Sequence, residues 1–505
     1  MLFRFRPAAY ADFVPEAPLV SENPFVNRAP DERRPPLLAD VRDRIPEPFW
    51  DGHDAEMACY WRVWDLAFRN LKRAAPHNGF IRPFIDTAYN DCLFLWDSVF
   101  ILMFARYGER AFRFQETLDN LYHFQEADGF LPREVQEWDG QHRFHRHDPV
   151  STGPNVFAWS EWEYFLNFGD SERLRDVFPG LLAYHRWMRR YRTWQDGTYW
   201  SCGLACGMDN QPRASEAFEA FTDHGHLSWI DATAQAALNA RLLRQIAGVI
   251  GREGEVADLA DEERNLGETI NRDFWNEERG FYFDRDRHGR PTEVPTIGAY
   301  WVLLAGLVPA ERLNRFVSHL EAADEFATHH RVPSMPASHP DYHPLGSYWL
   351  GGVWPPTNYM ILRGLTLAGR DGLAFEIAAN HVRRVTEVFE KTGTVWENYA
   401  PDVSEPGNNS KGDFVGWGGV GPVAVLFEYL FGLRPDVPSG ELLLDVRLTE
   451  RYGIRRYPFG AATTLDLAVA ARASEFDEPQ VDVVSDHPVR LRIRWAGGER
   501  VRDVG

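Results

Sequence analysis

The chain has 505 residues and a formal net charge of −20, from 54 Lys and Arg against 74 Asp and Glu. This acidic balance argues against nucleic acid or an anionic membrane as a partner, because both require a basic surface. The hydrophobic fraction of 44% and the charged fraction of 25% are typical of a soluble globular protein with ample material for a core.

We expect neither a leader peptide nor a membrane-spanning segment. No apolar region follows Arg4 and Arg6, and no run of about 18 apolar residues occurs, so we expect a cytoplasmic protein without a membrane partner. The oligomeric state stays open. The cysteines are too few for a disulfide framework in a chain of this length: Cys59, Cys92, Cys202 and Cys206.

Residues 1–50, rich in Pro and Arg, predict an extended N-terminal arm. After residue 51, apolar positions that recur at i, i+3, i+4 and i+7 predict twelve helices. The predicted helices lie near residues 54–74, 93–107, 110–126, 156–168, 171–192, 228–249, 254–276, 295–307, 309–322, 353–368, 370–391 and 417–432.

Short and long linkers alternate between these helices, which predicts six helical hairpins. Aromatic and acidic residues gather in the long linkers, at 75–92, 127–155, 193–227, 277–294, 323–352 and 392–416. A closed ring of hairpins would bring all six linkers to one rim. We therefore expect residues 51–434 to form an (α/α)6 toroid, a six-hairpin barrel, with an α-solenoid as the alternative.

After residue 434 the apolar pattern changes to period two. Alternation in 444–448, 464–469 and 489–495 predicts strands, and turn residues separate them. We expect residues 435–505 to form a small C-terminal antiparallel β module that caps the helical domain.

The first chemical motif is Gly-Met-Asp-Asn at 207–210, in a loop rich in Gly and Pro. Such a loop can hold the carboxyl group of Asp209 away from bulk water and raise its pKa, as a general acid requires. A solvated loop aspartate, common in Gly-rich turns for backbone reasons, is the structural alternative.

The second motif is Trp-Glu-Asn-Tyr at 396–399, in the linker before the last helix. A carboxylate between two aromatic residues and an amide is costly to bury unless it is used. Glu397 is therefore our candidate general base, against the alternative of a surface glutamate beside a helix. Two such carboxyl groups are what hydrolysis of a glycosidic bond needs.

Aromatic and polar residues in the long linkers, and at the starts of the helices that follow them, are candidates for sugar binding. Core packing would account for many of the aromatic ones, and Asp97 also suits the first turn of a helix electrostatically. The candidate substrate-binding residues are Trp96, Asp97, Asn155, Trp159, Arg213, Tyr348, Trp349, Trp354, Tyr399 and Trp417.

We predict no cofactor and no metal in the catalytic site. His142, His145 and His147 cluster with Asp148, but this group favours a polar loop over a metal site, because it forms no ligand set of clear geometry. The partner that the motifs indicate is a small oligosaccharide or glycoside substrate.

Five motifs, in this order, resemble the inverting glycosidases of the trehalase and processing α-glucosidase group, glycoside hydrolase families 37 and 63. They are Phe94-Leu-Trp-Asp97, Gly207-Met-Asp-Asn-Gln-Pro-Arg213, Phe274-Trp275 with Gly280-Phe-Tyr-Phe283, Tyr348-Trp349 with Val353-Trp-Pro-Pro356, and Thr394-Val-Trp-Glu-Asn-Tyr399. Bacterial mannosylglycerate and glucosylglycerate hydrolases are similar in helical-domain size. The resemblance implies Asp209 as acid, Glu397 as base, and inversion at the anomeric carbon of a small α-glucoside or α-mannoside.

Some features leave the substrate open. Leu350-Gly351-Gly352 stands where trehalases tend to have Arg-Gly-Pro, which argues against a trehalase. The C-terminal β module is similar to that of α-L-rhamnosidases, and a phosphorylase on the same barrel is a further alternative. If the aglycone is a glycerate, a cation must meet its carboxylate, and Arg133, Arg213 and Arg331 are the candidates.

Overall fold

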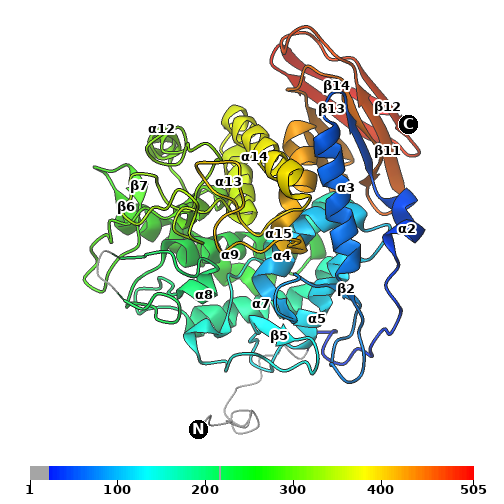
Figure 1. Cartoon of the computed structure of the whole chain (residues 1–505). Coiled ribbons are helices and arrows are strands. Elements are labelled where there is room, and N and C mark those ends of the chain that lie inside the picture. Colours follow the sequence, from blue (N-terminus) through cyan, green and yellow to red (C-terminus); the bar gives the residue numbers. More distant parts are fainter. Residues whose placement is uncertain (1–21, 215–217) are drawn as a thin grey trace.

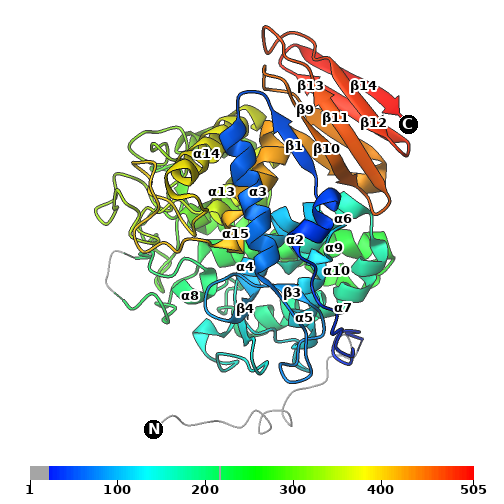
Figure 2. The same ribbon diagram turned by 45° about the vertical axis from the view of Figure 1, so that its right-hand side comes forward.

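The structure is a computed structural model that describes residues 22–214 and 218–505. A mainly helical body carries two four-stranded sheets on one side, whose C-terminal strands are drawn in orange and red in Figure 1. The segment 47–50, near the start of the described chain, lies beside the C-terminal strands in both views (Figure 2).

Each of the twelve predicted ranges contains a helix, but the helix near 110–126 begins only at Thr117 and the α-helix near 295–307 is four residues long. The helices are α3 (Asp54–Arg69), α4 (Leu95–Ala105), α5 (Thr117–His123), α6 (Phe157–Phe168), α7 (Ser171–Tyr191), α9 (Ile230–Ile250), α10 (Ala257–Thr269), α11 (Trp301–Leu304), α12 (Ala310–Ser318), α13 (Pro355–Leu367), α14 (Asp371–Thr392), and α15 (Val415–Gly418) with a π-helical continuation at Val420–Leu430. Two short helices, α2 (Leu38–Val41) and α8 (Gly203–Cys206), lie outside this series.

The helices differ in burial. Every residue of α4 is buried, and so is every residue of the π-helical segment Val420–Leu430. In α12, by contrast, only Phe316 and Val317 are buried. A helix that is apolar on all sides belongs inside a protein, whereas a one-sided apolar stripe marks an outer helix.

Six helices follow one another in a closed series of contacts. Helix α4 contacts α6, α6 contacts α9, α9 contacts α11, α11 contacts α13, α13 contacts the segment Val420–Leu430, and that segment contacts α4. Aromatic rings meet between them: the centroid of Trp301 lies 6.2 Å from that of Trp96 and 5.7 Å from that of Trp159. These rings pack in the interior of the helical body.

The C-terminal residues form two sheets. One has the order β1 (Glu47–Trp50), β10 (Tyr452–Phe459), β11 (Thr463–Val469), β12 (Val481–Ser485); the other has β14 (Gly498–Val504), β13 (Val489–Trp495), β9 (Glu441–Asp445), β8 (Leu433–Asp436). Three two-stranded pairs lie in the helical linkers: β2 (Leu71–Lys72) with β3 (Phe84–Ile85), β4 (Cys92–Phe94) with β5 (Glu134–Gln136), and β6 (Trp275–Asn276) with β7 (Phe281–Tyr282).

One pairing differs from the purely antiparallel module that the sequence predicts. Strands β9 and β13 pair in parallel, with Leu491 opposite Leu442. The chain passes through β10, β11 and β12 of the other sheet between these two strands, so β13 returns in the same direction as β9. Strand β1, which belongs to the predicted arm, completes the other sheet beside β10.

Within the described ranges, no helix has the length and apolarity that crossing a bilayer requires. Among these same residues, no group of three or more His, Cys, Asp or Glu side chains is arranged to hold a metal ion. The four cysteines are buried and unpaired with one another.

Candidate active site

A cavity of about 270 Å³ opens among the long linkers. Five of the six predicted long linkers supply lining residues; only 277–294 supplies none. The lining residues are Tyr89, Asn90, Phe94, Trp96, Asp97, Arg133, Glu134, Arg143, Phe144, Gly153, Pro154, Leu204, Gly207, Asp209, Tyr348, Trp349, Trp354, Glu397, Phe414 and Trp417. The predicted gathering around one site is therefore observed for five of the six linkers.

Both candidate catalytic carboxylates line this cavity, and so do six of the ten candidate binding residues. These six are Trp96, Asp97, Tyr348, Trp349, Trp354 and Trp417. They come from positions spread over more than 300 residues of the sequence, which only the tertiary fold brings together.

Two glycines shape the loop that carries Asp209. A Cβ atom on Gly203 would lie 2.1 Å from the Asp209 carbonyl oxygen, and one on Gly207 would lie 2.9 Å from the Trp96 ring. Gly207 also has a φ of +78°, a conformation that favours glycine. The loop therefore packs its backbone directly against Trp96, and this fixes Asp209 at the cavity wall.

The pKa of Asp209 is raised to about 6, chiefly by burial, because a low-polarity environment disfavours the charged form. The neighbouring Glu134 carboxylate also raises this pKa, whereas the Arg133 guanidinium lowers it. A carboxyl group with such a pKa keeps a proton over part of the neutral range, as a general acid requires.

Glu397 is 2% exposed and its carboxylate accepts two hydrogen bonds. The Tyr348 hydroxyl donates to Oε1 at 3.2 Å, and the Lys411 backbone N–H donates to Oε2 at 3.2 Å. Burial raises the pKa of Glu397 to about 7, while these two donors lower it and Asp209 raises it further. The donors stabilise the ionised form and orient it toward the cavity.

The pKa of Glu397 is higher than that of Asp209, although a general base is expected to have the lower pKa of the two. The Asp209 carboxylate is one of the causes that raise the pKa of Glu397, so the order of the two values does not by itself assign the roles. We assign the roles from the hydrogen bonds, because two fixed donors on Glu397 favour its carboxylate form.

A third carboxyl group, that of Asp97, lies in the first turn of α4 and lines the same cavity. Burial raises its pKa well above the ordinary value, and Glu397 and Glu134 raise it further. A protonated carboxyl group can donate a hydrogen bond as well as accept one, so Asp97 suits the hydroxyl groups of a sugar.

The sequence analysis did not identify Glu134, Arg143 and Phe144 as lining residues. The β4–β5 pair and the segment that follows it bring them to the cavity. Phe94 pairs with Glu134 across this ladder, which places Arg133 and Glu134 beside the start of α4. The guanidinium of Arg133 contacts the Glu134 carboxylate, and Arg143 Nε lies 3.4 Å from Glu134 Oε2. The Phe144 ring lies 4.8 Å from the Arg133 guanidinium. No local pattern signals this pairing, because the two strands lie 40 residues apart.

Arg213 lies outside the cavity. Its guanidinium donates to Asp284 at 2.8 Å and to Asp231 at 3.1 Å, and it stacks on the Trp229 ring at 4.3 Å. With 1% exposure it has no access to a ligand. It anchors the end of the 207–213 loop, because a buried guanidinium is held where its carboxylate partners lie.

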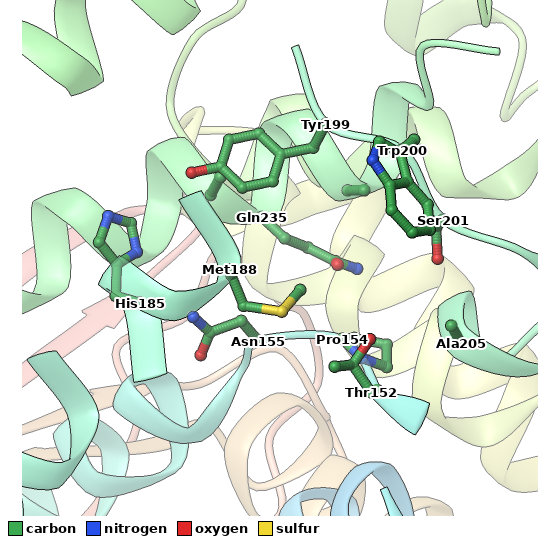
Figure 3. Close-up of a pocket in the computed structure, with 13 residues that line it drawn as sticks. Thr152, Pro154, Asn155, His185, Met188, Tyr199, Trp200, Ser201, Ala205 and Gln235 are labelled. Carbon is green, nitrogen blue, oxygen red and sulfur yellow. The ribbon is translucent and has the colours of Figure 1, made fainter. Parts of the chain in front are cut away.

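Asn155 lines a smaller, neighbouring cavity of about 20 Å³, shown in Figure 3. This cavity shares Gly153 and Pro154 with the larger one, and its volume corresponds to roughly one water molecule. The Nδ2 atom of Asn155 and the Nε2 atom of Gln235 are buried there without a hydrogen-bond partner in the described chain.

Trp159 and Tyr399 also lie away from the catalytic cavity. Trp159 is 3% exposed, donates to Glu163 at 3.1 Å and lines a separate cavity with Arg106 and Glu428. Tyr399 is fully buried, and its hydroxyl accepts from the Trp396 backbone N–H at 3.2 Å. Both rings serve packing here, because close helices and the turned-in 396–399 segment bury them.

Residues 90–415 match the family model described as the mannosylglycerate hydrolase MGH1-like glycoside hydrolase domain. The chain belongs to this family. The resemblance that the motifs indicate is thereby confirmed, and the protein is a glycoside hydrolase related to family 63.

Two curated relatives differ in how much of their length the enzyme spans. The mannosylglycerate hydrolase of Thermus thermophilus is 26% identical over 351 residues, which cover 57% of this chain and 84% of that protein. A probable mannosyl-oligosaccharide glucosidase of Schizosaccharomyces pombe is 29% identical over 279 residues, which cover 48% of this chain and 33% of that protein. The enzyme thus spans about a third of the length of the latter.

Among solved structures, the family 63 mannosylglycerate hydrolase of Thermus thermophilus in complex with Tris and D-glycerate is similar, with a TM-score of 0.58 and 21% identity. The match covers 72% of this chain and 99% of that chain. At this identity the likeness shows the fold alone, a mainly helical domain.

Proposed function

We propose that the enzyme hydrolyses a small α-glucoside or α-mannoside with inversion, and that Asp209 is the general acid and Glu397 the general base. The observation that carries this proposal is that Asp209 and Glu397, both with a raised pKa, line one cavity. Only Glu397 also has two fixed hydrogen-bond donors on its carboxylate. That asymmetry is what the two roles require.

In this mechanism Asp209 gives its proton to the glycosidic oxygen as the bond to the anomeric carbon breaks. Glu397 takes a proton from a water molecule, whose oxygen attacks the anomeric carbon from the opposite face. Asp209 leaves the step ionised and Glu397 leaves it protonated, and exchange with solvent restores both. Trp349, Trp354 and Trp417 supply an aromatic wall for the apolar face of the sugar.

We also propose that the six mutually contacting helices are the inner wall of an (α/α)6 toroid. The closed series of contacts from α4 round to Val420–Leu430 supports this arrangement, together with the complete burial of both of these elements. In such a toroid the linkers that line the cavity share one rim.

For the aglycone we propose a carboxylate-bearing group such as glycerate. Arg133 and Arg143 are the two guanidinium groups that line the cavity, and Arg143 is 44% exposed in its side chain. The other two candidates fit less well, because Arg213 pairs with buried carboxylates and Arg331 lines a separate groove. The 26% identity to a mannosylglycerate hydrolase supports this choice.

The direct test is to incubate the enzyme with α-glucosides, α-mannosides, their glycerate conjugates and α-L-rhamnosides, and to follow the released sugar by proton NMR. We expect the β-anomer first, from a glycerate conjugate of glucose or mannose. First release of the α-anomer would overturn inversion and the two catalytic roles. Release of rhamnose alone would replace the proposed substrate class.

The pH dependence of kcat/KM follows from the same pair. We expect a bell with limbs near pH 6 and pH 7, the pKa values of Asp209 and Glu397. Below the lower limb both groups are protonated and no base is present; above the upper limb both are ionised and no acid is present. A pH titration of initial rates checks this, and a plateau extending above pH 9 would contradict a shared proton.

A further inference from the structure

We propose that Asn210 is a positioning residue that sets the orientation of Glu397 through Tyr348. The inference rests on the proposed function, since it concerns how the proposed base is held. Asn210 directly follows Asp209 in the chain but reaches across to the linker that carries Tyr348, so one side chain ties the Asp209 loop to the Tyr348 linker.

Asn210 makes two hydrogen bonds that span Tyr348. Its Nδ2 atom donates to the Ser347 carbonyl oxygen at 3.1 Å, and its Oδ1 atom accepts from the Trp349 backbone N–H at 2.8 Å. The amide thus pairs with the main chain on both sides of one residue, as a neighbouring strand would. This leaves Tyr348 little freedom to rotate about its own backbone bonds.

The backbone that Asn210 holds is a strained one. Ser347 has a φ of +34° and Tyr348 a φ of +67°, in the left-handed region that residues with a Cβ atom rarely occupy. Such a conformation persists only where the surroundings hold it in place. The clamp from Asn210 therefore helps to hold the Tyr348 side chain on the cavity side.

Further contacts fix Tyr348 from the opposite direction. Its carbonyl oxygen accepts from the Gly352 N–H at 3.2 Å and from Trp354 Nε1 at 3.3 Å. A Cβ atom on Gly352 would lie 2.3 Å from that oxygen, so the turn closes tightly behind Tyr348. With its backbone held at both ends, the hydroxyl of Tyr348 is directed to Glu397 Oε1.

Loss of the clamp has a defined chemical consequence. If Tyr348 relaxes to a negative φ, its hydroxyl leaves Glu397, whose carboxylate then keeps only the Lys411 N–H as donor. A carboxylate that loses a donor binds its proton more tightly. The upper limb of the pH profile should move to higher pH, and kcat should fall, because less of the pair carries its proton on Asp209.

The test compares Asn210→Ala, Tyr348→Phe and the double variant. We expect each single variant to move the upper limb of kcat/KM upward by roughly half to one pH unit and to lower kcat by about tenfold, with KM within about twofold. The double variant should match Tyr348→Phe alone, because Asn210 acts through the hydroxyl that this variant already lacks.

The chain offers a matched control in Asn380. Its Oδ1 atom accepts from the Arg331 N–H at 2.8 Å and its Nδ2 atom donates to the His329 carbonyl oxygen at 3.0 Å, the same clamp across one residue. Asn380 lies on α14 beside an outer groove. Asn380→Ala should lower the melting temperature about as much as Asn210→Ala does, without moving either limb of the pH profile.

The outcomes separate the inference from the function on which it rests. If Asn210→Ala behaves as Asn380→Ala does while Tyr348→Phe moves the limb, the positioning role is wrong and the proposed function stands. Additive effects in the double variant would likewise overturn it, because Asn210 would then act apart from Tyr348. If Glu397→Gln hydrolyses the substrate at the full rate, Glu397 is not the general base and the proposed function is wrong.

Discussion

Glu397→Gln is expected to lower kcat for hydrolysis by about 10²- to 10⁴-fold, since no other group in the proposed mechanism takes the proton from the attacking water. KM should change little, because the amide keeps the shape of the side chain and its contact with Tyr348. Initial-rate kinetics on the substrate found by NMR measure both constants. Turnover that survives in this variant and depends on added phosphate would support a phosphorylase instead.

The same variant should be more stable than the parent enzyme at alkaline pH. The folded pKa of Glu397, about 7, lies above the ordinary value of 4.5, so ionisation opposes folding increasingly as pH rises from about 4.5 to 7. That cost, up to about 3 kcal/mol, disappears with the glutamine, and the difference should vanish near pH 4. Denaturant unfolding at pH 4 and pH 8 measures it.

Glu109 provides the matched control for that stability change. Burial raises the pKa of its carboxyl group to about 8, and it accepts a hydrogen bond from the Gln115 N–H at 3.2 Å, outside the catalytic cavity. Glu109→Gln should also stabilise the fold at alkaline pH, but with kcat unchanged. If both variants lose activity equally, the fall in kcat follows from the increased stability of the fold and not from loss of the base.

Asp209→Asn is expected to lower kcat by an amount that depends on the leaving group of the substrate. On a glycoside with a sugar or glycerate leaving group, kcat should fall about 10²- to 10⁴-fold, because the departing alkoxide needs a proton. On a nitrophenyl glycoside of the same sugar, whose leaving group departs as a stable anion, the loss should be far smaller. The ratio of the two rates, in variant and parent, is the measurement.

Asp97→Asn is the control for the general-acid role of Asp209, because it also removes a carboxyl group from the cavity. Asp97 lines the same cavity and its pKa is also raised, chiefly by burial. Its substitution should raise KM for both substrates alike, since a hydroxyl-binding group does not sense the leaving group. If Asp97→Asn shows the leaving-group dependence and Asp209→Asn does not, the acid is Asp97.

The helices and the two catalytic candidates could be predicted from the sequence. Periodicity is a local property, so twelve apolar stripes predict twelve helices without knowledge of their neighbours. Asp209 and Glu397 stand in motifs whose composition is itself informative, since a carboxylate among glycine, amide and aromatic residues is costly unless used. The gathering of the long linkers followed from their alternation with short ones.

Interactions between segments that are distant in the sequence could not be predicted from it. The motif 207–213 contains Asp209, Asn210 and Arg213 within five positions, yet their side chains go to the cavity, to the Ser347–Trp349 backbone and to a buried acid pair. Sequence reasoning assigned Arg213 to the substrate, because a motif does not show which way each side chain points.

The sequence by itself determined the kinds of element, their order and the residue types available for chemistry, because these depend on neighbours a few positions apart. Tertiary structure alone decided that β9 pairs in parallel with β13 and that Glu134 and Arg143 line the cavity beside Asp97. It also decided the raised pKa values of Asp209 and Glu397. Each of these depends on burial and on partners tens to hundreds of residues away, which periodicity and motif composition do not encode.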